Sequence, residues 1–550
     1  MARNRRPGEA PVVPTRGPTE TPLALLLHAR RFRVAAGGER VAANVIAGGA
    51  QVSADAPAWV GLSAPPLDTP TLSLGPNPGS LGPHSYGFLN NARGGLGAVV
   101  ALDLPPPAQL PRAGRLGIIV PRRDALPDLI PLLCARDLPI SWLVSVGDGD
   151  PGEALAFLSQ DANTDAIAIV LGEGAKPAGL RAAIGAKPTV VLGGDALCRA
   201  VARRAGSHVV DRIGEWLALG ALLGAGATLE DPVEIWIIGG GVAWLRGELG
   251  RYAVDVPVQL LDERDPNAIL DAIGRAVAPR LAIVIGAGVT LPAAVAPASG
   301  QDQLDRVRLV VADTSQPEQV SRLLKALGAE LARRSVRTED GGTDSLAAPS
   351  GPADPELAAR VRAETDGTLS DHDAKRLFKA WGLKVSRQGP TGTPTGAVKL
   401  ARLIGIPAVL VRGDDERVAD SVPEVRRLAA LMLETPGDDA RSVMVRERYA
   451  ESPRCKVRIA QERGVGSTIK VTDASKLGDA IAILPIEGAE ALRLAKQGGA
   501  RRASDQQQVA AVLIQLGVLA LAEHASFDIE LFIANEPVVV RATGTLRKTT

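Results

Sequence analysis

The stretch that decides the fold is LGIIV at residues 116–120, a short apolar run that leads into a proline. Comparable apolar runs recur in the next part of the chain, with helical patterns between them, at 141–146, 166–171 and 189–192 for the strands and 126–136 and 152–160 for the helices. Apolar strands that alternate with helices are typical of βαβ units, in which helices cover both faces of a parallel sheet. This region is therefore predicted to be α/β.

A second set of the same kind begins with EIWII at 234–238 and runs directly into Gly239-Gly240-Gly241. Its further strands are expected at 258–261, 281–285 and 307–311. We interpret the two sets as two flavodoxin-like, doubly wound domains, the second with a glycine turn of its own.

Residues 335–358 are polar and rich in Gly, Pro and Ser, and they are predicted to be a linker. Beyond them Ser370 precedes a helical pattern as a favourable N-cap, with Asp371 and Asp373 in the first turn, where carboxylates stabilise the helix dipole. The remainder mixes strands and helices in α+β fashion, with the last strands expected at 527–533 and 537–540.

The composition excludes several classes of function. The 550 residues carry a net charge of +1, from 62 basic and 61 acidic side chains, so no long-range field would attract nucleic acid or an anionic membrane. Aromatic residues make up 3%, too few to predict stacking platforms for single-stranded nucleic acid. No run of 18 apolar residues is present, so no membrane span is predicted and a cytoplasmic location is expected. The three cysteines are dispersed and predict neither a disulfide framework nor a metal knuckle.

Three stretches occur in the order typical of one enzyme family, namely VSVGDGD at 144–150, KPTVVL at 187–192 and AKRLFKAWGLKV at 374–385. The chain resembles the nucleoside-diphosphate-forming acyl-CoA synthetases, which include ADP-forming acetate–CoA ligases and are related to succinyl-CoA synthetase. Weaker matches are GPN at 75–77, which includes Gly75 and Asn77, and FDIEL at 527–531.

The resemblance implies an architecture for the whole chain. Its parts would be a disordered tail (1–20), an abridged Rossmann-like CoA-binding region (21–113), a succinyl-CoA-ligase-like flavodoxin-like domain (114–228), a second flavodoxin-like domain (229–334), the linker (335–358) and an ATP-grasp-like α+β domain (359–550). It also implies ATP or ADP, CoA and Mg²⁺ as ligands, and assembly into homo- or hetero-oligomers.

Family chemistry requires a histidine that carries a phosphoryl group between two sites. The family places it in a loop after the strand that corresponds to 187–192, but here the chain continues directly to the following strand. His208 is the nearest candidate, although its neighbours match that later strand, and an ordinary histidine at a strand edge is the alternative. Glu173 is the candidate for the glutamate that orients the histidine, if a slip of one residue is allowed.

Phosphate and CoA would be held mainly by backbone N–H groups at glycine-rich turns and helix N-termini. By resemblance the candidates are Gly75 and Asn77, the glycine turn Gly239-Gly240-Gly241, and the pair Arg122 and Arg123. The two arginines follow Pro121, which lacks an N–H donor, so a solvated surface turn is the alternative.

In the ATP-grasp-like part the resemblance assigns nucleotide binding to Arg412 and Glu447, and to Gly464 and Gly466 as a phosphate loop or a plain turn. Arg412 follows by one residue the position where the family has a lysine, and neighbouring strand residues point to opposite faces. Glu530 replaces the family's metal-binding asparagine and is the candidate Mg²⁺ ligand. Arg541 falls near the acidic partner's position and would repel the metal.

Three hypotheses follow from these departures from the family's catalytic motifs. The favoured one is a catalytically impaired family member that acts as a regulatory or partner subunit, or as a nucleotide- or CoA-binding module. The alternative is an active acid–CoA ligase that uses altered residues, with His208 as phosphoryl carrier. A third is a scaffold that binds no nucleotide.

Overall fold

In the computed structural model the chain divides into two compact units, Met1–Glu339 and Asp340–Thr550. The structure describes residues 31–34, 51–52, 58–61, 71–73, 85, 87–91, 99–100, 111–121, 126–136, 138–172, 174–225, 233–238, 242–252, 254, 256–261, 280–286, 307–313, 317–338, 351–413, 415–434, 442–449, 453–473, 479–533 and 536–547. Parallel sheets with intervening helices confirm the α/β class.

The largest sheet of the N-terminal unit has seven strands in the order β11-β10-β9-β7-β8-β5-β6. Its five parallel strands are β7 (Ala113–Val120), β8 (Ile140–Ser145), β9 (Ala166–Leu171), β10 (Thr189–Gly193) and β11 (His208–Val210). In chain order their arrangement is 2-1-3-4-5, the flavodoxin-like doubly wound order. Strands β5 (Gly87–Asn90) and β6 (Val99–Val100) extend this sheet in antiparallel fashion, so the sheet includes residues from the stretch 21–113.

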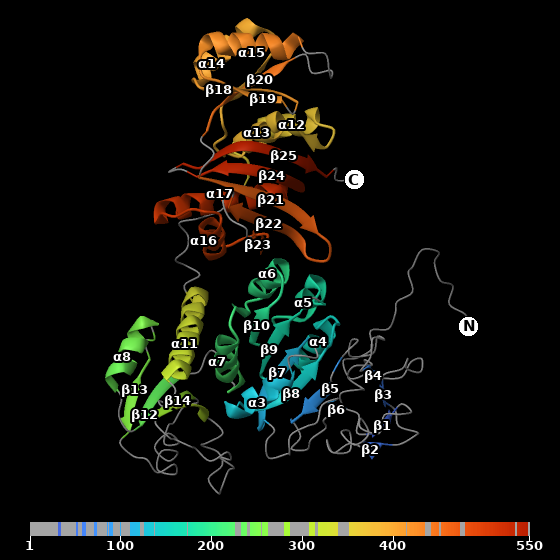
Figure 1. The fold of residues 1–550 in the computed structure, drawn as a ribbon, viewed down its shortest axis with the longest axis vertical. Coiled ribbons are helices and arrows are strands. Elements are labelled where there is room, and N and C mark those ends of the chain that lie inside the picture. The colour runs from blue at the N-terminus through green and yellow to red at the C-terminus, as the bar shows by residue number, and fades with distance from the viewer. Residues whose placement is uncertain are drawn as a thin grey trace, which may run out of the picture. The chain divides into compact units, whose positions relative to one another are not determined.

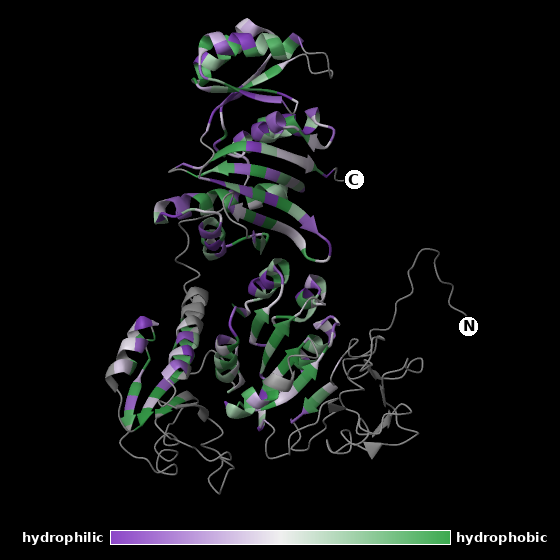
Figure 2. Cartoon of the chain, in the orientation of Figure 1, coloured by the Kyte–Doolittle hydropathy of each residue, from purple (hydrophilic) through white to green (hydrophobic). Residues whose placement is uncertain are grey.

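Helices cover both faces of this sheet, as Figure 1 shows. Alternate residues of β7 face opposite sides, so Leu116 and Ile118 pack in the core with helices α3 (Leu126–Ala135) and α7 (Ile213–Gly224). Gly117 faces the other side, where a Cβ atom would lie 2.9 Å from Leu158. That side carries α4 (Gly152–Gln160), α5 (Pro177–Ala183) and α6 (Ala196–Arg204). The apolar strands form the hydrophobic interior seen in Figure 2.

Two smaller parallel sheets share the same winding. The first has the order β2-β1-β3-β4, from β1 (Arg31–Val34), β2 (Gln51–Val52), β3 (Ala58–Gly61) and β4 (Thr71–Ser73). The second has the order β13-β12-β14-β15, from β12 (Val233–Ile238), β13 (Val258–Leu261), β14 (Arg280–Gly286) and β15 (Val307–Asp313). Helices α8 (Val242–Arg251) and α11 (Pro317–Thr338) pack in one hydrophobic core with the second sheet.

The predicted linker 335–358 is helical at both ends, because α11 continues to Thr338 and α12 (Pro355–Glu364) begins inside it. Ser370 caps helix α13 (Asp371–Ala380) as predicted, since its hydroxyl accepts the N–H of Asp373 at 3.2 Å.

The C-terminal unit contains two antiparallel sheets. A four-stranded sheet in the order β17-β20-β18-β19 consists of β17 (Gln388–Thr391), β18 (Ala408–Arg412), β19 (Asp415–Ala419) and β20 (Val443–Glu447). Its core includes helices α14 (Pro394–Ile404) and α15 (Val422–Glu434). A six-stranded sheet in the order β16-β25-β24-β21-β22-β23 consists of β16 (Thr368–Leu369), β21 (Arg454–Glu462), β22 (Gly466–Asp473), β23 (Asp479–Ile483), β24 (Ala525–Phe532) and β25 (Val538–Leu546).

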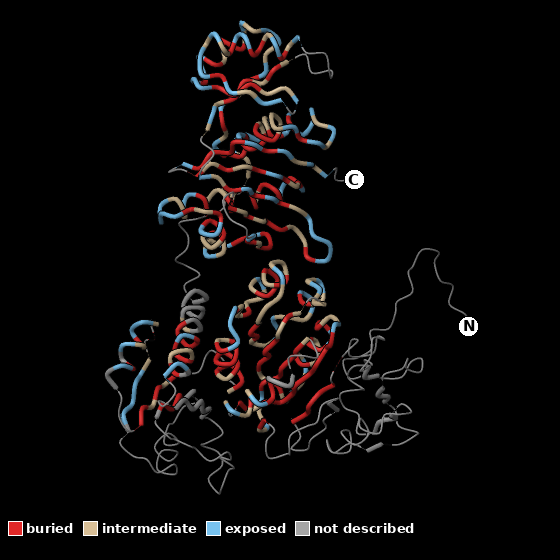
Figure 3. Tube along the Cα trace, in the orientation of Figure 1, coloured by how far each residue is buried: buried red, intermediate tan, exposed pale blue. Residues whose placement is uncertain are grey.

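The six-stranded sheet buries only one of its faces. Residues along β21 and β24 alternate between buried and accessible, as the colours in Figure 3 show. The buried face packs on α13, α16 (Gly488–Gln497) and α17 (Ala503–Ala522), while the other face keeps charged side chains accessible. This polar face forms one wall of the cleft described below.

One helix in the described part of the chain, α17, is long and apolar enough to cross a membrane by length and composition, which the expectation from sequence had not identified. Its apolar residues, such as Leu513 and Leu516, are fully buried in the hydrophobic core of the C-terminal unit. In this structure α17 is a core helix.

Substitution of Trp216 on α7 tests how much the packing of this helix stabilises the seven-stranded sheet. Its side chain is fully buried, and its indole N–H donates to the carbonyl of Ile169 at 3.2 Å. Trp216→Ala removes this packing and leaves a cavity, so we expect a loss of about 3–5 kcal/mol in unfolding free energy, measured by urea titration with circular dichroism. Trp244→Ala is the matched control, because Trp244 is 37% exposed and its loss should cost less than about 1 kcal/mol. Equal losses for the two variants would contradict this role.

Candidate functional site

The C-terminal unit contains a cleft of about 910 Å³ between its two antiparallel sheets. One wall comes from β18, β19 and β20, the other from β21, β22, β24 and β25, and the first turn of α13 closes part of it. The charged lining residues are Asp371, Arg412, Glu416, Arg446, Lys456, Arg458, Lys470, Asp528, Glu530 and Arg541. Six of these ten are cationic, so the lining is more basic than acidic.

Strand register places the charges of the second wall. Lys456 of β21 lies opposite Glu530 of β24, which lies opposite Arg541 of β25. Arg458 lies opposite Asp528, whose carboxylate it approaches at 3.8 Å. Because side chains alternate along a strand, all of these residues project from the same face.

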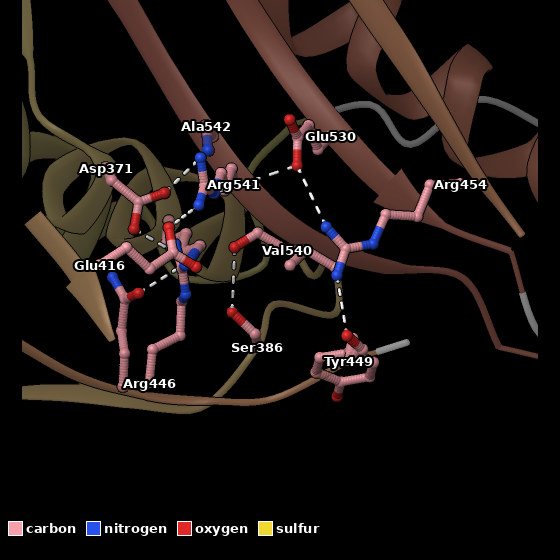
Figure 4. A network of polar contacts seen from close by, with 12 residues as sticks. Asp371, Ser386, Glu416, Arg446, Tyr449, Arg454, Glu530, Val540, Arg541 and Ala542 are labelled. Atoms are coloured by element: carbon pink, nitrogen blue, oxygen red, sulfur yellow. Dashed lines mark hydrogen bonds and ion pairs between the residues drawn. The ribbon is translucent and has the colours of Figure 1, made fainter. Parts of the chain in front are cut away.

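Ion pairs join the two walls through Glu416 and Arg541, as Figure 4 shows. Glu416 of β19 accepts from Arg446 of its own sheet at 2.7 Å and also pairs with Arg541 of the other sheet. Arg541 in turn lies 4.0 Å from Glu530, which is also 3.4 Å from Arg454. The two glutamates therefore share three arginines and keep little free negative charge.

Asp371 and Lys375 form a second part of the network at the start of α13. The carboxylate of Asp371 accepts the Lys375 ammonium at 3.0 Å and the backbone N–H of Ala542 at 2.8 Å, which ties α13 to β25. Lys375 also donates to Gln388 at 2.7 Å. Its pKa is lowered to about 8, chiefly because burial disfavours the ammonium and in spite of the neighbouring Asp371.

Arg446 is the buried cation of the cleft, with only 7% of its side chain exposed. Burial lowers the pKa of its guanidinium, while the charges of Asp371 and Glu530 raise it. A buried arginine keeps its charge and is satisfied by hydrogen bonds, so it supplies a fixed positive potential inside the cleft.

The predicted nucleotide residue Arg412 does line the cleft. Pairing between β18 and β19 is regular, without a bulge, and Val411 and Arg412 both line the cleft at the end of β18. The guanidinium of Arg412 also donates to the carbonyl of Met432, which anchors it to α15.

Glu447, the predicted adenine-side residue, forms an ion pair with Arg387. Its carboxylate accepts the guanidinium of Arg387 at 2.8 and 3.2 Å and the Arg387 backbone N–H at 3.1 Å. Burial of Glu447 acts to raise its pKa, but these bonds to Arg387 outweigh it and the pKa is lowered. Glu447 lies at the end of β20 beside the cleft lining, so its binding role stays a prediction.

Gly464 and Gly466 lie in a β-hairpin between β21 and β22, where Glu462 and Gly466 face each other across the strands. Both glycines have positive φ, +76° and +107°, and Val465 of the same turn is buried. The backbone turn thus explains both glycines without a ligand. Their role in phosphate binding stays a prediction.

His208 is the first residue of β11, the edge strand of the seven-stranded sheet, and pairs in register with Val190. It therefore lies at the amino end of a parallel strand. Ligands of open α/β sheets bind beyond the carboxyl ends of the strands. This placement favours the alternative of an ordinary histidine at a strand edge.

Eight further candidates lie outside the described residues: Gly75, Asn77, Arg122, Arg123, Glu173, Gly239, Gly240 and Gly241. Among the residues that the structure describes, no group of three or more His, Cys, Asp or Glu side chains is placed to hold a metal ion. Glu530, the predicted Mg²⁺ ligand, is paired with Arg454 and Arg541, so the residues present do not fit a divalent cation.

Sequence reasoning missed Arg446, Glu416 and Lys456 as residues of the cleft. A signal was available for Lys456, because KVR at 456–458 alternates polar and apolar residues as a one-sided strand does. For Arg446 and Glu416 no local signal exists, since their partners lie on other strands.

A second cavity of about 470 Å³ lies in the N-terminal unit, between the start of α7, the end of α8 and α11. Arg212 is one of its four basic lining residues, and the other three, Arg251, Arg322 and Lys325, are paired with Glu248, Glu318 and Glu215, which neutralises most of their charge.

No family model matches the chain, and no curated protein matches it. Among solved structures, the dinucleotide-forming acetyl-coenzyme A synthetase 1 of Ca. Korarchaeum cryptofilum, in complex with phosphate and ADP, is 14% identical with a TM-score of 0.39, covering 60% of this chain and 99% of that chain. The same enzyme in complex with coenzyme A and acetyl-coenzyme A is 18% identical with a TM-score of 0.32, covering 35% and 99%. PH0766 of Pyrococcus horikoshii OT3 is 13% identical with a TM-score of 0.40, covering 56% and 99%. At these values the similarities carry no argument about chemistry, which has to rest on the residues of this chain.

The buried Lys375 predicts a specific pH dependence of stability. Its folded pKa of about 8 lies below the ordinary value of 10.5, so between these pH values the unfolded state binds more protons and stability rises with pH. Relative to Lys375→Met, the natural protein should gain about 3 kcal/mol of unfolding free energy between about pH 7.5 and 10.5. Lys379→Met, an exposed position on the same helix, is the control and should follow the natural curve. Parallel curves for the natural protein and Lys375→Met would contradict the lowered pKa.

Proposed function

We propose that this chain is a divergent relative of the nucleoside-diphosphate-forming acyl-CoA synthetases that has lost catalysis and serves as a regulatory or partner subunit. Its retained activity would be binding of an adenine nucleotide in the cleft of the C-terminal unit. The observation that carries the proposal is the pairing of Glu416 and Glu530 with arginines inside a cleft that keeps an excess of cations.

The cleft supports ligand binding by size and charge. A volume of about 910 Å³ falls within the range of small-molecule sites. Arg412 and Arg446 reach it from the four-stranded sheet, and Lys456 reaches it from the other wall. Phosphate groups are recognised by such converging ammonium and guanidinium groups.

The same residues argue against phosphoryl transfer. Transfer between nucleotides and protein groups depends on metal ions that neutralise the developing charge on phosphate oxygens. Glu530 is paired with Arg454 and Arg541 and does not offer such a metal a free ligand. His208, at the amino end of β11, is poorly situated to carry a phosphoryl group.

The remaining elements of the proposal follow from the sequence resemblance alone. CoA would bind through Gly75, Asn77 and the glycine turn Gly239-Gly240-Gly241, and the chain would assemble with copies of itself or with a related subunit. The alternative is an active ADP-forming acid–CoA ligase, which requires His208 as phosphoryl carrier and a route for metal binding that the described residues do not offer.

A coupled assay and a binding measurement together test the proposal. We expect the full chain to show no turnover of acetyl-CoA or succinyl-CoA with ADP and phosphate, and to be stabilised by ADP, by about 2.7 kcal/mol at a hundredfold excess over Kd. His208→Ala should bind ADP like the natural protein. Turnover that disappears in His208→Ala would establish the alternative, and the lack of any stabilisation by ADP would support a scaffold that binds no nucleotide.

A further inference from the structure

The charged side chains that line the cleft differ in whether they have a partner of opposite charge among the described residues. All four lining carboxylates have a cationic partner: Asp371 pairs with Lys375, Glu416 with Arg446 and Arg541, Asp528 with Arg458, and Glu530 with Arg454. A divalent cation in this cleft would have to displace arginine or lysine side chains from these carboxylates and remain beside those cations. Both requirements oppose metal binding.

Lys456 is in the opposite situation. It lies in the middle of β21, is exposed, and lines the cleft. Its strand neighbours are Glu530 and Thr472, yet no described carboxylate lies within ion-pair distance of its ammonium, because Glu530 turns to Arg454 and Arg541. Lys456 therefore retains its positive charge for a ligand.

From this arrangement we infer that the cleft binds a polyphosphate anion without a divalent metal, with Lys456 as the cation that takes the place of the metal. The inference rests on the proposed function in taking this cleft as the ligand site, and it narrows the ligand to a metal-free nucleoside polyphosphate. Arg412 and Arg446 would face the same anion from the other wall.

The flanking cations are less available than Lys456. Lys470 is paired with Asp479, and Arg458 with Asp528 at 3.8 Å. Arg541 is shared between Glu416 and Glu530. Because the inference assigns the anion contact to Lys456 in particular, a single substitution of this residue tests it.

The experiment is calorimetric titration of the full chain with ADP, and separately with inorganic tripolyphosphate, in EDTA and in millimolar Mg²⁺. We expect both probes to bind in EDTA, and the addition of Mg²⁺ to give no increase in the affinity for ADP. Lys456→Met should weaken both probes by about tenfold or more, since it removes a charged hydrogen-bond donor, and Lys456→Arg should restore most of the affinity. Mn²⁺ alone, followed by electron paramagnetic resonance, should not bind.

Lys496→Met is the matched control, because Lys496 is an exposed lysine on α16, which packs on the buried face of the same sheet. It should bind both probes like the natural protein. ADP binding that requires Mg²⁺ would overturn the inference and leave the proposed nucleotide function standing. Tripolyphosphate binding in EDTA without ADP binding would uphold the metal-free anion site and overturn the nucleotide assignment. Equal affinities for the natural protein and Lys456→Met would remove Lys456 from the site.

Discussion

The ion pairs that Arg541 makes with Glu416 and Glu530 are the constraint on which the C-terminal site depends. They connect a strand of the four-stranded sheet with two strands of the six-stranded sheet. Such pairs fix the position of one wall against the other only because several charges act together. Arg446 and Arg454 complete this network. An isolated exposed pair would contribute little.

The network also decides the chemistry of the cleft. A carboxylate shared between arginines is a poor ligand for a divalent cation, while Arg412, Arg446 and Lys456 supply positive charge to the cleft. The result is a cavity with the size of a nucleotide site and the charge pattern of an anion site. Buried Arg446 lines this cleft and supplies fixed positive charge there, at a cost in desolvation.

In the N-terminal unit, hydrophobic packing determines the fold and also the position of the candidate His208. In the seven-stranded sheet the parallel strands β7, β8, β9 and β10 are apolar and mostly buried, so hydrophobic burial stabilises this sheet. The position of His208 follows from the same topology. A strand that starts at a histidine places that side chain at the amino end of the sheet, away from the edge where open α/β sheets bind their ligands.

The sequence by itself determined the α/β class, the positions of the core strands and the cap of α13, because each depends on local periodicity and on hydrogen bonds between near neighbours. Strands such as Ala166–Leu171 and the helix Gly152–Gln160 match their predicted limits. Only the tertiary structure decided that Glu447 pairs with Arg387, that Glu530 is shared between two arginines and that Lys456 has no carboxylate partner among the described residues. These pairings join residues on different strands or segments, 60 residues apart for Arg387 and Glu447 and 76 for Arg454 and Glu530. The physical reason is that charge is balanced between neighbours in space, and strand register creates those neighbours only once the sheets have formed.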